Sequence, residues 1–313
     1  MQKKAIKREH TLAYLSLAGI CLLWGTTFLG IRIGVKDFPP FLFAAIRQMS
    51  AGLLLILILV FTQKNKFPGL THIIRMAVFG FFMITMGNGL VSWAEVFVDS
   101  GIAAIICSIM PVLVILINLA IDRSELPNPL IITGVIIGMA GIAFVFKEHL
   151  ASFANPNYTV GIVLIFAATI SWAMASILVR RVNQTTNPFL NAGLQMFFGG
   201  LWCLPFSFAF DNLSDVRWSN STVYALLYLI IFGSAMAYSL YFYAITKLPM
   251  TIASLYSYIN PLVAVFLGWL ILDEKLNLQI GLAFIITVTG IYMVSRGYQL
   301  KKQREADLSK AEP

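Results

Sequence analysis

Charge is scarce in this chain, since only 12% of its 313 residues are Asp, Glu, Lys or Arg and 59% are apolar. A soluble globular domain has about 25% charged and about 45–50% apolar residues. The mean hydropathy of +0.83 points in the same direction. The composition therefore excludes soluble enzymes, disordered proteins and nucleic-acid-binding modules as descriptions of the whole chain, and it predicts an integral membrane protein.

Cysteine and histidine are equally rare, with three of each. Cys21, Cys107 and Cys203 lie inside apolar runs more than 80 residues apart, so they offer neither metal-ligand spacing nor a disulfide framework. The histidines fall at or outside the ends of the apolar runs, no aspartate lies in the middle of one, and no G-x-S-x-G motif is present. An intramembrane enzyme needs a nucleophile with its base, paired aspartates or a metal cluster at depth. We therefore expect no catalytic residue, no metal and no cofactor.

Long apolar runs, in contrast, fill the chain. A bilayer core about 30 Å thick takes roughly 20 residues of helix to cross. Backbone groups must be satisfied inside the bilayer, and the alternation typical of a barrel is absent, so the runs predict an all-α membrane protein with ten transmembrane helices. The expected spans are residues 12–34, 38–62, 73–97, 101–121, 130–147, 160–181, 187–210, 221–246, 250–272 and 277–295.

Lysine and arginine are distributed unevenly between alternate connections. With both termini inside, sixteen of them fall on cytoplasmic segments and four on outer connections. Cytoplasmic loops of membrane proteins carry such an excess. We therefore expect a multi-pass protein of the cell (inner) membrane with both termini in the cytoplasm.

The two halves of the chain repeat each other at a nearly constant offset. Trp24 aligns with Trp172 at 148 residues, and Pro111 aligns with Pro261 at 150 residues. Five helices per half is an odd number, so the halves insert with opposite orientations, as in the inverted repeats of secondary transporters. The expected divisions are an N-terminal cytoplasmic tail (1–11), a first five-helix repeat (12–147), a second, inverted repeat (160–295) and a basic cytoplasmic C-terminal tail (296–313).

Three short motifs stand in each half: W-G-T-T-F at 24–28, R-x-G at 32–34, F-x-x-A-x-x-R at 41–47, W-A-M-A-S at 172–176, Asn260-Pro261, and D-E-K-L at 273–276. Together with the 5+5 inversion they resemble the EamA branch of the drug/metabolite transporter superfamily over about residues 12–295. Two positions depart from the repeat: Ala173 replaces the Gly of the first W-G pair, and Gln195 stands where Arg47 stands. The resemblance implies a polytopic inner-membrane carrier, often an exporter of amino acids or metabolites, and it names no substrate.

Deep polar and aromatic side chains are the candidates for substrate binding. Polar groups at bilayer depth usually face the bundle interior or water, and Trp24 and Trp172 lie too deep for an interfacial belt. We expect one central cavity between spans one, three, four, six, eight and nine. Its predicted walls are Trp24, Asn88, Trp172, Tyr238, Tyr256 and Asn260. The alternative is that these side chains only fill a tight bundle and bond between helices.

Four further residues have two interpretations each. Arg47, about 13 Å into its span, either holds the helix package or contacts a substrate carboxylate, and the neutral Gln195 favours the structural role. Glu95 is the one acidic residue within a span; it lies near the outer end, where headgroup water is the expected surrounding, and it leaves proton coupling open. Pro111 and Pro261 each free a carbonyl four residues earlier, so they form either gating breaks or packing kinks.

These features predict a secondary-active transporter that exports small amphipathic metabolites such as amino acids by alternating access. A nucleotide-sugar or drug-type carrier of the same fold is one alternative, but phosphate groups call for several deep cations and only Arg47 is clearly deep. A channel or scaffold is the alternative from another class; the lack of charged rings and of a carbonyl filter motif argues against an ion channel. The expected partners are a small-molecule substrate and the lipid bilayer, without nucleic acid, and the chain is expected to work as a monomer.

Overall fold

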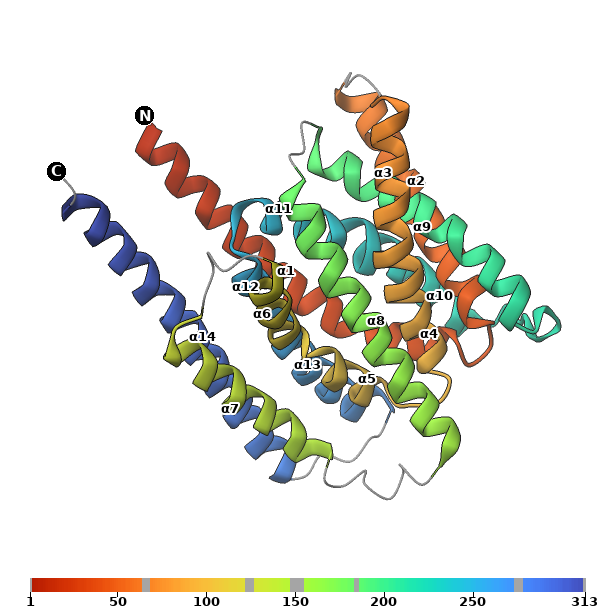
Figure 1. Cartoon of the computed structure of the whole chain (residues 1–313). Coiled ribbons are helices and arrows are strands. Elements are labelled where there is room, and N and C mark those ends of the chain that lie inside the picture. Colours follow the sequence, from red (N-terminus) through yellow and green to blue (C-terminus); the bar gives the residue numbers. More distant parts are fainter. Residues whose placement is uncertain are drawn as a thin grey trace.

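Helices account for all the regular structure in the described residues, which are 2–63, 68–121, 127–146, 155–182, 186–272 and 278–311 of a computed structural model (Figure 1). Ten helical segments follow one another along the chain, several of them interrupted. In the first half these are α1 (Gln2–Gly34), α2 (Pro40–Gln63), α3–η1–α4 (Leu70–Gly80, Phe81–Gly89, Leu90–Ala94), α5–α6 (Ser100–Cys107, Met110–Ile121) and α7 (Pro129–Phe146). In the second half they are α8 (Pro156–Arg181), α9 (Pro188–Phe210), α10–η5–α11 (Asn220–Tyr228, Leu229–Met236, Ala237–Lys247), α12–α13 (Met250–Ala253, Tyr256–Leu272) and α14 (Leu278–Ala311), with a short 3-10 turn, η4 (Leu213–Asp215), after α9.

The predicted all-α architecture of two five-helix halves is confirmed, and each helical segment overlaps one predicted span, with ends that differ by a few residues. Eight stretches are long and apolar enough to cross a membrane, and Pro129–Gly141 and Tyr256–Ile271 are shorter apolar helices. Helices α1 and α14 continue into the two predicted tails. The division into tails and repeats by residue number stays a prediction, and the 273–276 motif lies outside the described residues.

The starts of the second-half helices follow from local sequence. Proline occupies the first turn of α8 and α9, where its missing N–H costs nothing. The side chains of Asn155 and Asn187 accept hydrogen bonds from the backbone N–H groups of Asn157 and Phe189, so they cap these two helices. Ser219 caps α10 in the same way. These caps therefore determine the residue at which each of the three helices begins.

Equivalent helices of the two halves pack against each other, as a two-fold relation requires. Helix α2 packs along α9, and α7 packs along α14 at one edge of the bundle (Figure 1). Helix α1 packs on α11 and α13, and its counterpart α8 packs on η1, α4 and α6. Both termini lie on the same side of the bundle, hereafter the terminal side (Figure 1). An even number of crossings accounts for that placement.

The third span of each half contains a π-helical segment at the same place in the repeat. These segments are η1 and η5, which begin 148 residues apart at Phe81 and Leu229. π-Helical turns are rare and frequently occur at functional sites. Nothing in the sequence pattern predicts them.

The fourth span of each half is broken, but not at equivalent positions. The first break falls at residues 108–109, directly before Pro111, because α5 ends at Cys107 and α6 begins at Met110. The second falls at residues 254–255, so Pro261 lies inside the continuous helix α13. The two prolines therefore differ in their local geometry although they match in the repeat.

Candidate functional site

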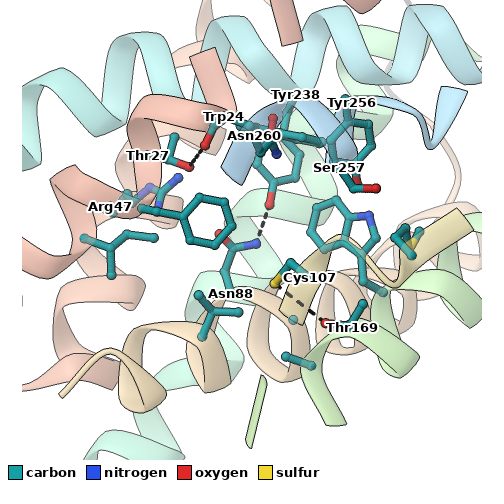
Figure 2. Close-up of a pocket in the computed structure, with 17 residues that line it drawn as sticks. Trp24, Thr27, Arg47, Asn88, Cys107, Thr169, Tyr238, Tyr256, Ser257 and Asn260 are labelled. Carbon is teal, nitrogen blue, oxygen red and sulfur yellow. Dashed lines mark hydrogen bonds between the residues drawn. The ribbon is translucent and has the colours of Figure 1, made fainter. Parts of the chain in front are cut away.

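A cavity of about 100 Å³ lies in the centre of the bundle (Figure 2). Residues from seven of the ten helical segments line it, including the second, which the sequence analysis left out. All six predicted wall residues and Arg47 are among the lining residues: Trp24, Asn88, Trp172, Tyr238, Tyr256, Asn260 and Arg47. The structure thus brings these side chains together, and their contact with a substrate stays a prediction.

Trp24 is the centre of an aromatic cluster on one wall of the cavity. Its ring centroid lies 5.5 Å from that of Trp172, 5.4 Å from Tyr238, 5.0 Å from Tyr241 and 4.7 Å from Tyr256. Most of these pairs meet edge to face, the arrangement that the quadrupoles of the rings favour. The rings come from α1, α8, α11 and α13, so both repeats contribute to the cluster.

Hydrogen bonds fix the orientation of this cluster. The Trp24 indole Nε1 donates to the Gly233 carbonyl in η5 over 3.2 Å. The Tyr241 hydroxyl, just outside the cavity, donates to Ser176 Oγ over 2.7 Å. These bonds connect α1 to η5 and α8 to α11, so the ring faces are held in place before any ligand binds.

The two predicted amides are also bonded between helices. Asn88 Nδ2 donates to the Tyr238 hydroxyl over 2.6 Å (Figure 2). The Asn260 amide, in the orientation that satisfies both of its ends, donates to the backbone carbonyls of Cys21 at 3.2 Å and Tyr256 at 3.0 Å. Both amides therefore make the interhelical contacts of the packing alternative and also line the cavity.

Arg47 reaches across the bundle from α2 to η5. Its side chain is buried, its Nε donates to Ser234 Oγ over 2.8 Å, and one terminal nitrogen donates to the Gly233 carbonyl over 3.4 Å. The first bond is short and the second is long, so the guanidinium is anchored at Nε and only weakly held at its tip. This geometry fits a structural role and also leaves the tip at the cavity wall.

Four polar lining residues are absent from the predicted walls: Thr27, Cys107, Thr169 and Ser257. The Thr169 hydroxyl donates to the Cys107 sulfur over 3.6 Å, and the Thr27 hydroxyl donates to the Trp24 carbonyl over 2.7 Å. A signal existed for Cys107, since its carbonyl is the one that Pro111 frees, and for Thr169, which precedes Trp172 by about one helical turn. Pro111 and Pro261 do not line the cavity; each directly follows a lining residue.

Glu95 is not where the sequence analysis placed it. The side chain is fully buried instead of lying in headgroup water, because α8 packs along α4 and Arg32 of α1 reaches the Glu95 backbone. Arg32 of α1 donates to the Glu95 backbone carbonyl and forms an ion pair with Asp99 at 3.4 Å. These contacts join α1 to the end of the third span on the side opposite the termini, and the ion pair between Lys247 and Glu9 at 2.9 Å joins α11 to α1 on the terminal side.

Comparison with known proteins places this arrangement in a family. The family model described as the EamA-like transporter family matches residues 11–147 and 159–296. The chain is 31% identical over 286 residues, 91% of both proteins, to YedA of Escherichia coli strain K12, named an uncharacterized inner membrane transporter. It is 24% identical to the Bacillus subtilis transporter YoaV, over 92% of this chain and 98% of that protein, and 27% identical to a WAT1-related chloroplastic protein of Arabidopsis thaliana, over 87% and 66%.

The fold recurs among solved structures. One crystal structure superposes with a TM-score of 0.73 at 18% identity and covers 90% of this chain and 96% of its own. At that identity the likeness concerns the fold alone, whereas the family model covers both halves. The chain belongs to the EamA-like transporter family.

Proposed function

We propose that this transporter is a secondary-active exporter of small amphipathic metabolites such as amino acids, and that it works by alternating access. The observation that carries the proposal is the central cavity, in which preoriented ring faces and a few amides and hydroxyls surround a space of about 100 Å³. Ligand sites have this composition, mostly apolar with a small number of placed polar groups. The volume holds several water molecules, and therefore suits a small solute.

The charge of the lining residues supports a neutral or zwitterionic substrate. Arg47 is the one cation among the described residues that line the cavity. A nucleotide sugar carries phosphate groups, which proteins bind through several cationic side chains. The weakly held tip of Arg47 is suited to a single carboxylate, and the aromatic cluster to a flat or apolar side chain.

The paired helices around the cavity support alternating access. The lining helices of the first and fourth spans have counterparts in the other half, so rocking of one half against the other exposes the same residues to opposite sides. The broken fourth spans, with Pro111 and Pro261 beside lining residues, supply the points that bend. The ion pairs of Arg32 and of Lys247 are the contacts that open in turn on the two sides.

The proposed location is the inner membrane with both termini in the cytoplasm. The name of the E. coli relative gives that membrane for that protein, and the sixteen-to-four charge distribution supports the orientation. Reporter fusions test it. Fusions after residues 36, 99, 150 and 215 should report outside, and those after 66, 125, 184 and 313 should report inside.

The direct test of the function is a metabolite profile of cells that lack or overproduce the protein, followed by exchange assays in proteoliposomes. An exporter should lower the internal and raise the external level of its substrate when it is overproduced. Labelled L-phenylalanine and L-leucine are suitable first probes, because each joins an α-carboxylate to an apolar side chain. Identical profiles in both strains and no exchange of any amino acid would contradict the proposed substrate class.

A further inference from the structure

Glu95 is a carboxylic acid buried without a hydrogen-bond partner. The residue directly follows α4, its exposed fraction is 0%, and neither carboxyl oxygen has a hydrogen-bond partner among the described residues. A polar group in this situation needs an explanation, because burying it unsatisfied costs free energy and an isolated carboxylate costs far more. Acidic side chains at membrane depth commonly carry protons or bind substrate.

The groups around Glu95 come from four helices and the following connection. Arg32 on α1, Arg47 on α2 and Cys107 on α5 interact with Glu95 itself. Asp99 pairs with Arg32, and Tyr158 on α8 interacts with Asp99. The two arginines are the cations that interact electrostatically with Glu95, but Arg32 is engaged by Asp99 and by the Glu95 backbone, and Arg47 by Ser234. Neither donates to the carboxyl group. In this conformation the neutral, protonated acid is the form that the surroundings favour.

Glu95 lies between the cavity and the solvent-facing contacts at the opposite side. Arg47 and Cys107, which interact with it electrostatically, both line the cavity. On the other flank, the Arg32 side chain is 24% exposed and that of Asp99 is 60% exposed. If the Arg32–Asp99 pair opens, water reaches the Glu95 carboxyl group from the side opposite the termini. If the terminal side opens, water reaches that carboxyl group through the cavity, past Arg47 and Cys107. Glu95 can therefore exchange its proton with either side, but only after the bundle changes conformation on that side.

We propose that Glu95 is the proton-binding site that couples substrate export to proton entry. This inference rests on the proposed function. With the opposite side open, Glu95 takes up a proton from the outer solution after substrate leaves; with the terminal side open, it releases that proton to the cytoplasm as substrate binds. One proton then enters for each substrate molecule exported, and no other bond is made or broken.

A first experiment tests the proton site without any substrate. Infrared spectra of the reconstituted wild-type protein, recorded across a pH titration, should contain a protonated-carboxyl band that disappears at high pH and is absent from Glu95→Gln. Asp215→Asn, which removes an exposed acid on the same side, should leave that band unchanged. Identical titrations of wild type and Glu95→Gln would overturn the proposal.

A second experiment tests coupling with labelled L-phenylalanine and L-leucine in proteoliposomes. In the wild type, a pH gradient should drive accumulation against the substrate gradient, while Glu95→Gln should lose this accumulation and keep exchange at equal pH. Glu95→Asp should restore part of it. Gradient-driven accumulation by Glu95→Gln at the wild-type level would refute coupling through this residue. If the wild type exchanges neither amino acid, the proposed substrate class fails, and the infrared titration still decides whether Glu95 binds the proton.

Discussion

Arg47 and Gln195 occupy the same position of the two repeats, 148 residues apart, and make different contacts. Arg47 donates to Ser234 in the third span of the second half. Gln195 reaches the third span of the first half, where its amide nitrogen lies 3.4 Å from the Met76 sulfur and its amide oxygen has no partner among the described residues. One crossing therefore carries a charge with a strong acceptor, and the other carries a neutral amide in an apolar setting.

The backbone is nearly symmetric where α2 and α9 pack against each other. Gly52 on α2 and Gly200 on α9 are also 148 residues apart. A Cβ on Gly52 would come within 2.4 Å of the Phe197 backbone nitrogen, and one on Gly200 within 2.7 Å of the Met49 backbone nitrogen. Close approach of the two helices is thus a shared property of the repeats, whereas the charge belongs to one of them. A symmetric scaffold carries an asymmetric site.

Placing an arginine at both repeat positions should lower stability the most. Gln195→Arg would bury a second guanidinium beside Met76 with no acceptor like Ser234, and an uncompensated buried charge costs about 3–5 kcal/mol. Gln195→Met is the matched control, because it keeps the size and removes an amide whose oxygen is already unpartnered. Thermal unfolding in detergent measures both variants. Wild-type stability of Gln195→Arg would show that the second crossing accepts a charge.

The reverse substitution, Arg47→Gln, should destabilise less. It removes a charged hydrogen bond to Ser234, and such bonds contribute about 1.5–3 kcal/mol. We expect a lower unfolding temperature and protein level, with a smaller change in the apparent affinity for amino acids. Stable protein that had lost affinity specifically for carboxylate-bearing substrates would make substrate contact the main role of Arg47.

The glycine pair tests the symmetric part of the comparison. Gly52→Ala and Gly200→Ala should each lower stability by about 1–3 kcal/mol, as overpacking of a tight interface does. Their effects should be similar, since both methyl groups meet backbone atoms. Gly281→Ala on α14 is the control, because a Cβ there meets nothing within 4 Å. If only one of the two substitutions lowered stability, the packing of α2 on α9 would be asymmetric too.

The smallest effect on stability is expected at Asp211, which directly follows α9. Its carboxylate accepts from the backbone N–H groups of Leu42 at 2.8 Å and Phe41 at 3.4 Å, so it caps α2. Burial raises the pKa of Asp211 above its ordinary value, and the N–H groups oppose that rise only in part. Asp211→Ala should be about 1 kcal/mol less stable than Asp211→Asn, which keeps an acceptor.

The pH dependence at Asp211 has a definite sign. Because its pKa is raised in the folded protein, protonation favours the fold, and this contribution is lost as the pH rises through the raised value. The unfolding temperature of the wild type relative to Asp211→Asn should therefore increase as the pH falls below neutral. A relative decrease on acidification would contradict the assignment.

Much of the fold and of the cavity could be predicted, for a physical reason. Runs of apolar residues determine helices in a bilayer, and a deep amide or indole has nowhere to lie except inside the bundle, so Asn88 and Trp172 were predicted at its centre. Glu95 could not be placed that way. At the end of a span, sequence does not distinguish headgroup water from burial, because the difference depends on how α8 and Arg32 of α1 cover this residue.

The breaks and π-helical segments within the spans were the other feature that the sequence did not fully predict. Pro111 marked a nearby break correctly, but the break before α13 lies well ahead of Pro261. The π-helical segments leave no residue pattern, since they depend on packing against neighbouring helices. Ser234 and the Gly233 carbonyl of η5 accept hydrogen bonds from Arg47 and hold its side chain beside the cavity. The sequence does not show this contact between α2 and η5.

The most direct test of the central claim, that the cavity binds substrate, is amino-acid exchange by alanine variants of its ring wall. Trp24→Ala, Trp172→Ala and Tyr256→Ala, made one at a time, should give folded protein whose exchange of L-phenylalanine and L-leucine is impaired or altered in preference. Trp202→Ala, which removes a ring that is 48% exposed on α9, should exchange as the wild type does. Three destabilised variants with unaltered preference would contradict the claim and leave the rings as packing alone.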